Sequence, residues 1–215
     1  MADKFNGIIV EQLPVGMMEV NCYLVFEADS RKGIIVDPGD EGSHILHRVE
    51  DLGLKIDQIV LTHGHGDHIG AVEYIQKRLE VEIAVGRADA SMLRDASINL
   101  SQNLGISIEL READVLLAEG DTVAVGEHKL TVIETPGHTL GGISLVGEGF
   151  VISGDLIFAG SIGRVDLPGG NYDTIINAIK TKILPLGDHY IIYPGHGPKT
   201  SVLQEKTFNP FLIEE

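Results

Sequence analysis

Short apolar runs, separated by glycine, proline and acidic residues, recur along most of the chain and predict buried strands. The runs are rich in valine and isoleucine, whose branched side chains pack well on a pleated sheet. They cover residues 7–10, 22–26, 33–36, 56–61, 82–85, 129–133, 143–146, 150–153 and 190–193. The sequence therefore predicts a protein built on many short strands.

Three other segments carry apolar side chains every three or four positions, as on one face of a helix. They cover residues 43–52, 68–79 and 172–184, and a fourth segment, 87–105, is predicted as a helix with a loop. Strands mixed with helices predict an α/β (α+β) fold in which helices cover the sheet faces. No stretch has the composition of a linker, so we expect a single domain over residues 1–215.

Charge and cysteine content narrow the possible partners and location. The chain has 16 basic and 32 acidic residues, a net charge of −16, which argues against a nucleic acid or an anionic membrane as partner. Cys22 is the single cysteine, so the chain has no internal disulfide, and it is expected to be a buried apolar side chain. The first residues lack the apolar core of a secretory signal, and no apolar run is long enough to span a membrane. We therefore expect a cytoplasmic protein.

The segment 62–68, THGHGDH, is the strongest chemical signal in the chain. It places His63, His65, Asp67 and His68 directly after a predicted strand and before a predicted helix. Imidazole and carboxylate are the ligands that zinc, iron and manganese accept in proteins. The two glycines of the segment reduce side-chain bulk, which would let an ion approach the backbone. A surface loop explains one histidine here, but four ligand-type side chains at this spacing indicate a metal site.

Three later ligand-type residues repeat the same placement. His138, Asp155 and His196 each follow a predicted strand and stand beside glycine or proline. Together with the first segment they supply five histidines and two aspartates, enough for two metal ions.

With these residues in view, the sequence resembles the metallo-β-lactamase superfamily, whose signature T-H-x-H-x-D-H stands at 62–68. The likeness runs from VDPG at 36–39 to PGHG at 194–197. Within the superfamily it looks most like the short bacterial members of the glyoxalase II (hydroxyacylglutathione hydrolase) group, which share GDLIF at 154–158 and GRVD at 163–166, with NPFL at 209–212. The resemblance implies a four-layer αββα sandwich without the C-terminal helical domain of full-length glyoxalase II.

The resemblance also implies a ligand set for two divalent metal ions, with zinc as the first choice and iron or manganese as alternatives. The first metal would take His63, His65 and His138; the second would take Asp67, His68 and His196; and Asp155 would bridge them. Two such ions would activate a water molecule and polarise a thioester carbonyl, with Asp67 and Asp155 as the catalytic carboxylates. Thr62, Thr139 and backbone carbonyls are possible partners for the ligand histidines.

The implied substrate is a small-molecule thioester of the S-2-hydroxyacylglutathione type. Only 19 residues follow His196, too few for the domain that contacts glutathione in full-length relatives. Arg164, Tyr172 and Lys199 are therefore the candidates for contact with an anionic substrate. The sequence leaves the oligomeric state open.

Four other functions are compatible with parts of this pattern. A mononuclear iron persulfide dioxygenase would use residues matching His63, His138 and Asp155, all present here, although the run GSIG at 160–163 resembles the hydrolase pattern more. Secreted β-lactamases often have a cysteine where Asp155 stands, and nuclease members need a basic surface. A scaffold that kept only the fold would usually have lost ligands.

Overall fold

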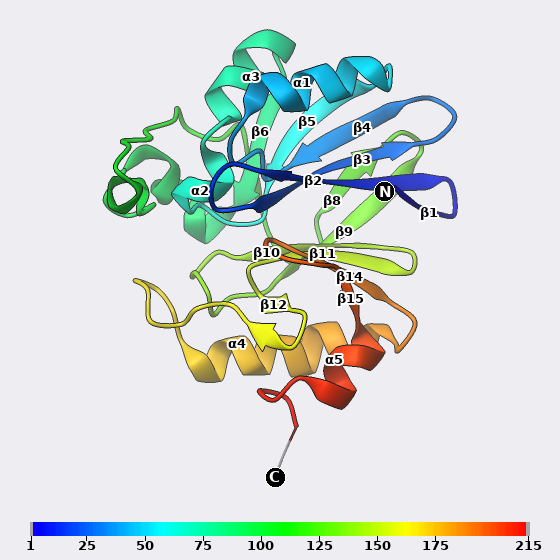
Figure 1. The fold of residues 1–215 in the computed structure, drawn as a ribbon, viewed down its shortest axis with the longest axis vertical. Helices are drawn as coiled ribbons and strands as arrows, with labels where there is room; N and C mark the ends of the chain where they lie inside the picture. The colour runs from blue at the N-terminus through cyan, green and yellow to red at the C-terminus, as the bar shows by residue number, and fades with distance from the viewer. Residues whose placement is uncertain (1, 214–215) are drawn as a thin grey trace.

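The chain folds into two β-sheets that face each other, with helices on both outer sides (Figure 1). The computed structural model describes residues 2–213. The first sheet has the order β1 (Asp3–Phe5), β2 (Ile8–Val15), β3 (Val20–Glu27), β4 (Lys32–Val36), β5 (Lys55–Leu61), β6 (Glu82–Gly86) and β7 (Val115–Leu117). The second has the order β15 (Thr200–Ser201), β14 (Ile191–Pro194), β11 (Phe150–Gly154), β10 (Ile143–Gly147), β9 (His128–Glu134) and β8 (Thr122–Val125). A separate hairpin joins β12 (Ile157–Phe158) to β13 (Ser161–Ile162).

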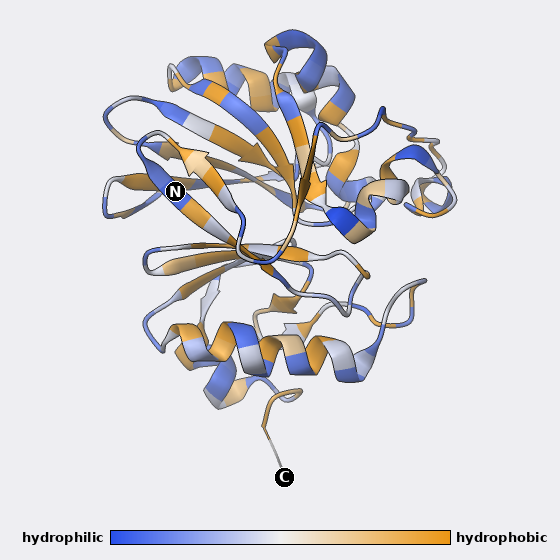
Figure 2. Ribbon diagram, turned by 180° about the vertical axis from the view of Figure 1, so that it is seen from behind, coloured by the Kyte–Doolittle hydropathy of each residue, from blue (hydrophilic) through white to orange (hydrophobic). Residues whose placement is uncertain are grey.

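Helices cover the outer face of each sheet and complete four layers. The first sheet carries α1 (Gly42–Asp51) and α3 (Val72–Leu79), and the second carries α4 (Tyr172–Ala178) and α5 (Val202–Phe208) (Figure 1). Figure 2 shows the alternation of hydrophobic and hydrophilic positions along these helices, which is the pattern of a helix with one buried face. The predicted α/β (α+β), four-layer αββα sandwich is confirmed.

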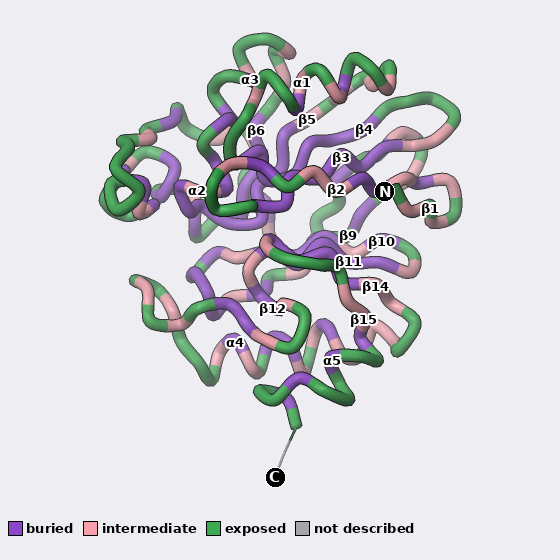
Figure 3. The backbone as a smooth tube through the Cα atoms, in the orientation of Figure 1, coloured by how far each residue is buried: buried purple, intermediate pink, exposed green. Residues whose placement is uncertain are grey.

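Strand β3 shows how alternation along a strand builds two of the cores. Tyr23 and Val25 face the second sheet, whereas Cys22, Leu24 and Phe26 face the helices of the first. Every one of these side chains is buried, and Figure 3 shows burial concentrated in the strands of both sheets. Cys22 is therefore the buried apolar side chain that the sequence predicts.

The helix predicted over 68–79 is interrupted. Helix α2 (Gly66–Ile69) ends before Gly70, and α3 begins at Val72. The interruption follows from a close backbone approach, because a Cβ at Gly70 would lie 2.2 Å from the carbonyl oxygen of Gly39. Ala71 N donates instead to Pro38 O at 2.9 Å, which anchors the break against the loop after β4.

The prediction of an α-helix within 87–105 is wrong. The segment forms two 3₁₀ turns, η1 (Arg87–Arg94) and η2 (Ser101–Leu104). Leu100, with φ of +66°, occupies the left-handed region and prevents a continuous helix. The helix predicted over 172–184 is divided into three parts. Helix α4 covers only its first half and continues as a π turn (Ile179–Ile183) and then a 3₁₀ turn (Leu184–Leu186).

Across residues 2–213, no helix is long and apolar enough to cross a membrane.

Candidate metal centre

The seven predicted metal ligands lie together beside the ends of strands from both sheets. The loop after β5 and the first turn of α2 supply His63, His65, Asp67 and His68. The other three, His138, Asp155 and His196, follow β9, β11 and β14 of the second sheet. The site is therefore assembled from both halves of the fold.

The two glycines of the 62–68 segment let the loop pack closely against η1 and η2, and do not open a path for an ion. A Cβ at Gly64 would lie 2.6 Å from Met92 Cβ, and one at Gly66 would lie 2.7 Å from Ser101 Cβ. The expected opening toward the backbone is thus filled by side chains of η1 and η2. The loop is pressed against these turns, which fixes where its histidines point.

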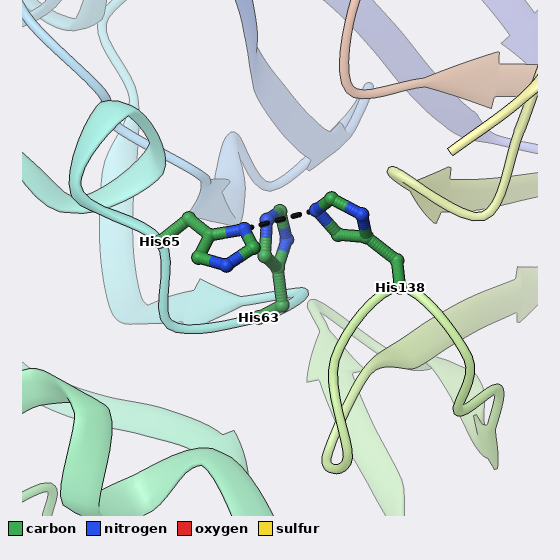
Figure 4. Close-up of side chains that lie close together, drawn as sticks. All are labelled: His63, His65 and His138. Carbon is green, nitrogen blue, oxygen red and sulfur yellow. Dashed lines mark hydrogen bonds between the residues drawn. The ribbon is translucent and has the colours of Figure 1, made fainter. Parts of the chain in front are cut away.

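His63, His65 and His138 form the first group of possible ligands. One nitrogen from each lies within 4.8 Å of the others, and His65 Nδ1 lies 2.9 Å from His138 Nε2. Figure 4 shows the three rings turned toward one another, with His63 and His65 on one loop and His138 on another. All three residues are buried, so their convergence is set by the fold.

Asp67, His68 and His196 form a second group whose ligand atoms also lie within 4.8 Å of one another. Asp155 stands between the groups. Its Oδ1 is 3.4 Å from His68 Nε2, and its Oδ2 is 3.6 Å from both His138 Nε2 and His196 Nε2. This position matches a carboxylate shared by two cations.

Unsatisfied buried atoms test whether these residues fit a metal. His63 Nε2, His68 Nε2 and Asp155 Oδ1 belong to the ligand groups, are buried and have no hydrogen-bond partner. A buried polar atom without a partner costs about 1–3 kcal/mol, so three such atoms in one site would be a large penalty. Divalent cations would satisfy all of them, and the donor set of imidazole and carboxylate therefore fits such ions.

The other ring nitrogen of most ligand histidines is fixed by an acceptor. His138 Nδ1 donates to Arg164 O at 2.7 Å, and His196 Nδ1 donates to Met18 O at 3.0 Å. A carbonyl oxygen can only accept, so these rings carry their proton on Nδ1 and leave the Nε2 lone pair free for a metal. Backbone carbonyls are thus partners here, as the sequence allowed.

Asp37 is a supporting residue to which sequence reasoning gave no role. It is fully buried, and it accepts from Thr62 N at 2.7 Å, Thr62 Oγ1 at 2.6 Å and His68 Nδ1 at 3.0 Å. Thr62 Oγ1 in turn lies 3.1 Å from His63 Nδ1. One carboxylate therefore orients two ligand histidines, which is the usual arrangement around protein-bound metals. The signal in the sequence was its place at the end of β4.

Burial and neighbouring charges set the protonation states of six of the seven ligands. Burial lowers the pKa of His63 far below its usual value, and burial lowers that of His65 to about 4, so both rings are neutral at neutral pH. Burial would raise the pKa of Asp67 and of Asp155, but the adjoining His68 and His196 outweigh it and lower both. Burial would also lower the pKa of His68 and of His196, but the carboxylates of Asp155 and Asp67 outweigh it and raise both. Both rings must therefore give up a proton when a metal binds.

Asp89, at the start of η1, ties together the two loops that carry the first ligand group. Its side chain is buried, and it accepts from Gly64 N at 3.2 Å and from Gly141 N at 2.6 Å. Gly64 stands between two ligand histidines, and Gly141 lies three residues after His138. Asp89 therefore links the two halves of the fold at the metal centre.

Replacing Asp89 with alanine is expected to destabilise the protein by about 2–3 kcal/mol, because two buried N–H groups lose a charged acceptor. Urea unfolding measures this as a lower midpoint with an unchanged slope. Asp95→Ala is the matched control, since Asp95 caps an exposed turn through Ser97. Equal stability of the Asp89 and Asp95 variants would contradict the linking role.

Of the three predicted substrate contacts, only Arg164 lines the cavity above the ligands. A cavity of about 340 Å³, here called the metal-side cavity, opens over the ligands, and Arg164 lines it. Arg164 is exposed and pairs with Asp166 at 2.8 Å. Tyr172 starts α4 and Lys199 pairs with Asp3, and neither belongs to the described residues that line this cavity.

Comparison with known proteins places these observations in a family. Residues 15–196 match the sequence profile of the Metallo-beta-lactamase superfamily. The chain is 38% identical to the probable metallo-hydrolase YqgX of Bacillus subtilis (strain 168), over 94% of this chain and 96% of that protein. It is 36% identical to the hydroxyacylglutathione hydrolase GloC of Haemophilus influenzae, over 94% of this chain and 97% of that protein.

Several solved structures are similar to this chain in both fold and sequence. BLEG-1 B3 metallo-beta-lactamase has a TM-score of 0.91 and 34% identity, covering 95% of this chain and 100% of the other. TTHA1623 in a di-iron-bound form has a TM-score of 0.84 and 32% identity, covering 94% and 100%. ETHE1 from Myxococcus xanthus has a TM-score of 0.78 and 27% identity, covering 94% and 83%.

Proposed function

The chain belongs to the metallo-β-lactamase superfamily, and from this premise we infer that it is a metal-dependent hydrolase that cleaves thioesters of the S-2-hydroxyacylglutathione type. The likeness to GloC supports the choice of substrate. The observation that carries the proposal is the convergence of seven ligand-type side chains, three of whose facing atoms are buried without partners. We expect the protein to act in the cytoplasm on a small molecule.

The proposed ligand assignment follows the two groups. His63, His65 and His138 would hold one ion, Asp67, His68 and His196 would hold the other, and Asp155 would contact both. Such ions supply a water molecule of lowered pKa and polarise the carbonyl under attack. Zinc is the first candidate, and iron is the second because TTHA1623 holds two irons on a similar fold.

The protein's own groups then orient the reaction. Asp67 is ionised, partly exposed and lines the metal-side cavity, so it can accept a hydrogen bond from a water molecule there and orient it. Asp37, through His68, and the backbone carbonyls at Met18 and Arg164 keep the rings in one tautomer and one orientation.

The test is hydrolysis of S-lactoylglutathione by protein whose metal content is measured on the same sample. We expect turnover that a chelator removes and that added zinc, iron or manganese restores, because the reaction depends on the ions. The chelated protein should keep its circular-dichroism spectrum. Failure of fully loaded protein to hydrolyse this or any other thioester would overturn the proposal.

A mononuclear iron persulfide dioxygenase is the second candidate, and the likeness to ETHE1 favours it. It would use His63, His138 and Asp155, which lie together here. Oxygen uptake on addition of glutathione persulfide distinguishes the two candidates, because hydrolysis consumes no oxygen. A β-lactam belongs in the same panel because of the likeness to BLEG-1.

A further inference from the structure

A second cavity, here called the apolar cavity, adjoins the metal centre. It measures about 280 Å³, and its lining includes the apolar side chains Met17, Met18, Leu104, Ile106 and Ile108. Met17 is fully exposed, and Met18 and Ile106 are each 53% exposed. Large apolar side chains gathered at the surface beside a catalytic centre mark a binding site for an apolar group.

The apolar cavity and the metal-side cavity meet at the proposed catalytic carboxylate. Asp67, Met18 and Leu104 line both. A thioester has two substituents on either side of its carbonyl group. When that carbonyl lies beside Asp67, one substituent extends into each cavity.

The charged residues that line each cavity indicate which part of the thioester, acyl or thiol, binds there. The only charged side chains among the described residues lining the apolar cavity are Asp40 and Asp67, both acidic. The metal-side cavity is also lined by two carboxylates, Asp67 and Asp155, but it adds the cation Arg164 and the ligand histidines His65, His138 and His196 that would hold the metal ions. A thiol part with carboxylates, such as glutathione, is therefore repelled from the apolar cavity and favoured in the metal-side cavity.

We propose that the apolar cavity binds the acyl chain of the substrate and that the enzyme prefers thioesters with an apolar acyl chain of several carbons over the three-carbon lactoyl group. This inference rests on the proposed thioester hydrolysis. The cavity approaches the ~300 Å³ at which pockets begin to hold drug-sized ligands, and a lactoyl group would leave most of it unfilled. Its walls also offer the lactoyl hydroxyl few partners other than Asp40 and Asp67.

Binding of thioethers that cannot be hydrolysed tests the proposal without relying on turnover. Calorimetry on metal-loaded protein compares S-methylglutathione with S-hexylglutathione, which differ by five methylenes. Full burial of one methylene contributes about 0.8 kcal/mol, which is about fourfold in affinity. In a partly open cavity we expect about half of that free energy, which is about twofold per methylene. We therefore expect S-hexylglutathione to bind roughly 30-fold more tightly or better. Equal affinities, or no binding of either thioether, would overturn the proposal.

A pair of variants locates the effect. Ile106→Ser removes apolar surface from the apolar cavity and is expected to reduce the hexyl preference at least about threefold, with S-methylglutathione unaffected. Ile213→Ser is the control, because Ile213 is 50% exposed and lines neither cavity. Unfolding midpoints of both variants should match the parent protein, since both side chains are on the surface. A hexyl preference that survives Ile106→Ser unchanged would contradict the assignment.

Kinetics separate this inference from the proposed function. We expect kcat/KM for S-hexanoylglutathione to exceed that for S-lactoylglutathione at least tenfold. Hydrolysis of both at equal rates overturns the chain preference and leaves the proposed function standing. Hydrolysis of neither thioester, together with tight binding of S-hexylglutathione, overturns the proposed function and leaves the apolar site standing.

Discussion

Asp155→Ala is expected to abolish thioester hydrolysis and to release bound metal while the protein stays folded. The Asp155 carboxylate lies between the two ligand groups, 3.4 Å from His68 Nε2 and 3.6 Å from His138 Nε2. Without it neither group has its full set of donors. Metal ions stabilise the transition state by several kcal/mol, so kcat/KM should fall at least about 10³-fold. Metal analysis of the purified variant measures the loss directly.

The fold should survive this change because the apolar clusters are built elsewhere. Those clusters pack between the sheets and beneath the helices, and Asp155 belongs to none of them. Circular dichroism and urea unfolding should therefore resemble those of the metal-free parent. Asp188→Ala is the matched control, since Asp188 pairs with Lys206 on the surface. Unfolded Asp155→Ala protein, or variant protein with full metal content, would contradict the expectation.

The metal ligands were predictable because their signal is local. Four of them fall within six consecutive positions, and each of the other three follows a predicted strand rich in apolar residues. That the distant ligands meet was implied by the family resemblance, because the first four follow a strand of one sheet and the other three follow strands of the other. Their roles as ligands remain predictions that the metal analysis tests.

The residues that hold the ligands in place were not predictable in this way. Asp37 contacts Thr62, 25 positions away, and Asp89 contacts Gly141, 52 positions away. No spacing rule joins an aspartate to backbone N–H groups at such separations, because the first contact depends on the pairing of β4 with β5 and the second on how the two sheets stack. The sequence therefore identifies the candidate ligands but not the residues that orient them.

The three candidates for substrate contact differ in where the fold places them. Lys199 lies only three residues after His196, yet it pairs with Asp3 at the first strand. Gly197, with φ of +73°, turns the chain there. A role for Lys199 or Tyr172 in binding substrate stays a prediction, whereas Arg164 lies in the lining of the metal-side cavity.

Gly195→Ala is expected to remove metal binding although it changes no ligand. A Cβ at Gly195 would lie 2.0 Å from Asp155 Oδ1 and 2.8 Å from His68 Cε1. The backbone cannot withdraw, because Gly195 O accepts from Asn21 N at 2.8 Å and Gly195 N donates to Gly154 O at 2.9 Å. The new methyl group must therefore displace the carboxylate that stands between the two ligand groups.

We expect metal affinity to fall at least about 100-fold in Gly195→Ala, the upper range for displaced supporting groups, and activity to fall with it. The φ angle of Gly195 is not in the left-handed region, so alanine adds no backbone strain and the loss comes from the close approach alone. Gly142→Ala is the control, because its Cβ would lie no closer than 3.0 Å to any neighbour. Competition with a metal-sensitive dye measures both variants. Equal affinities would show that the Asp155 carboxylate can move without loss, and that its position between the two ligand groups does not determine metal binding.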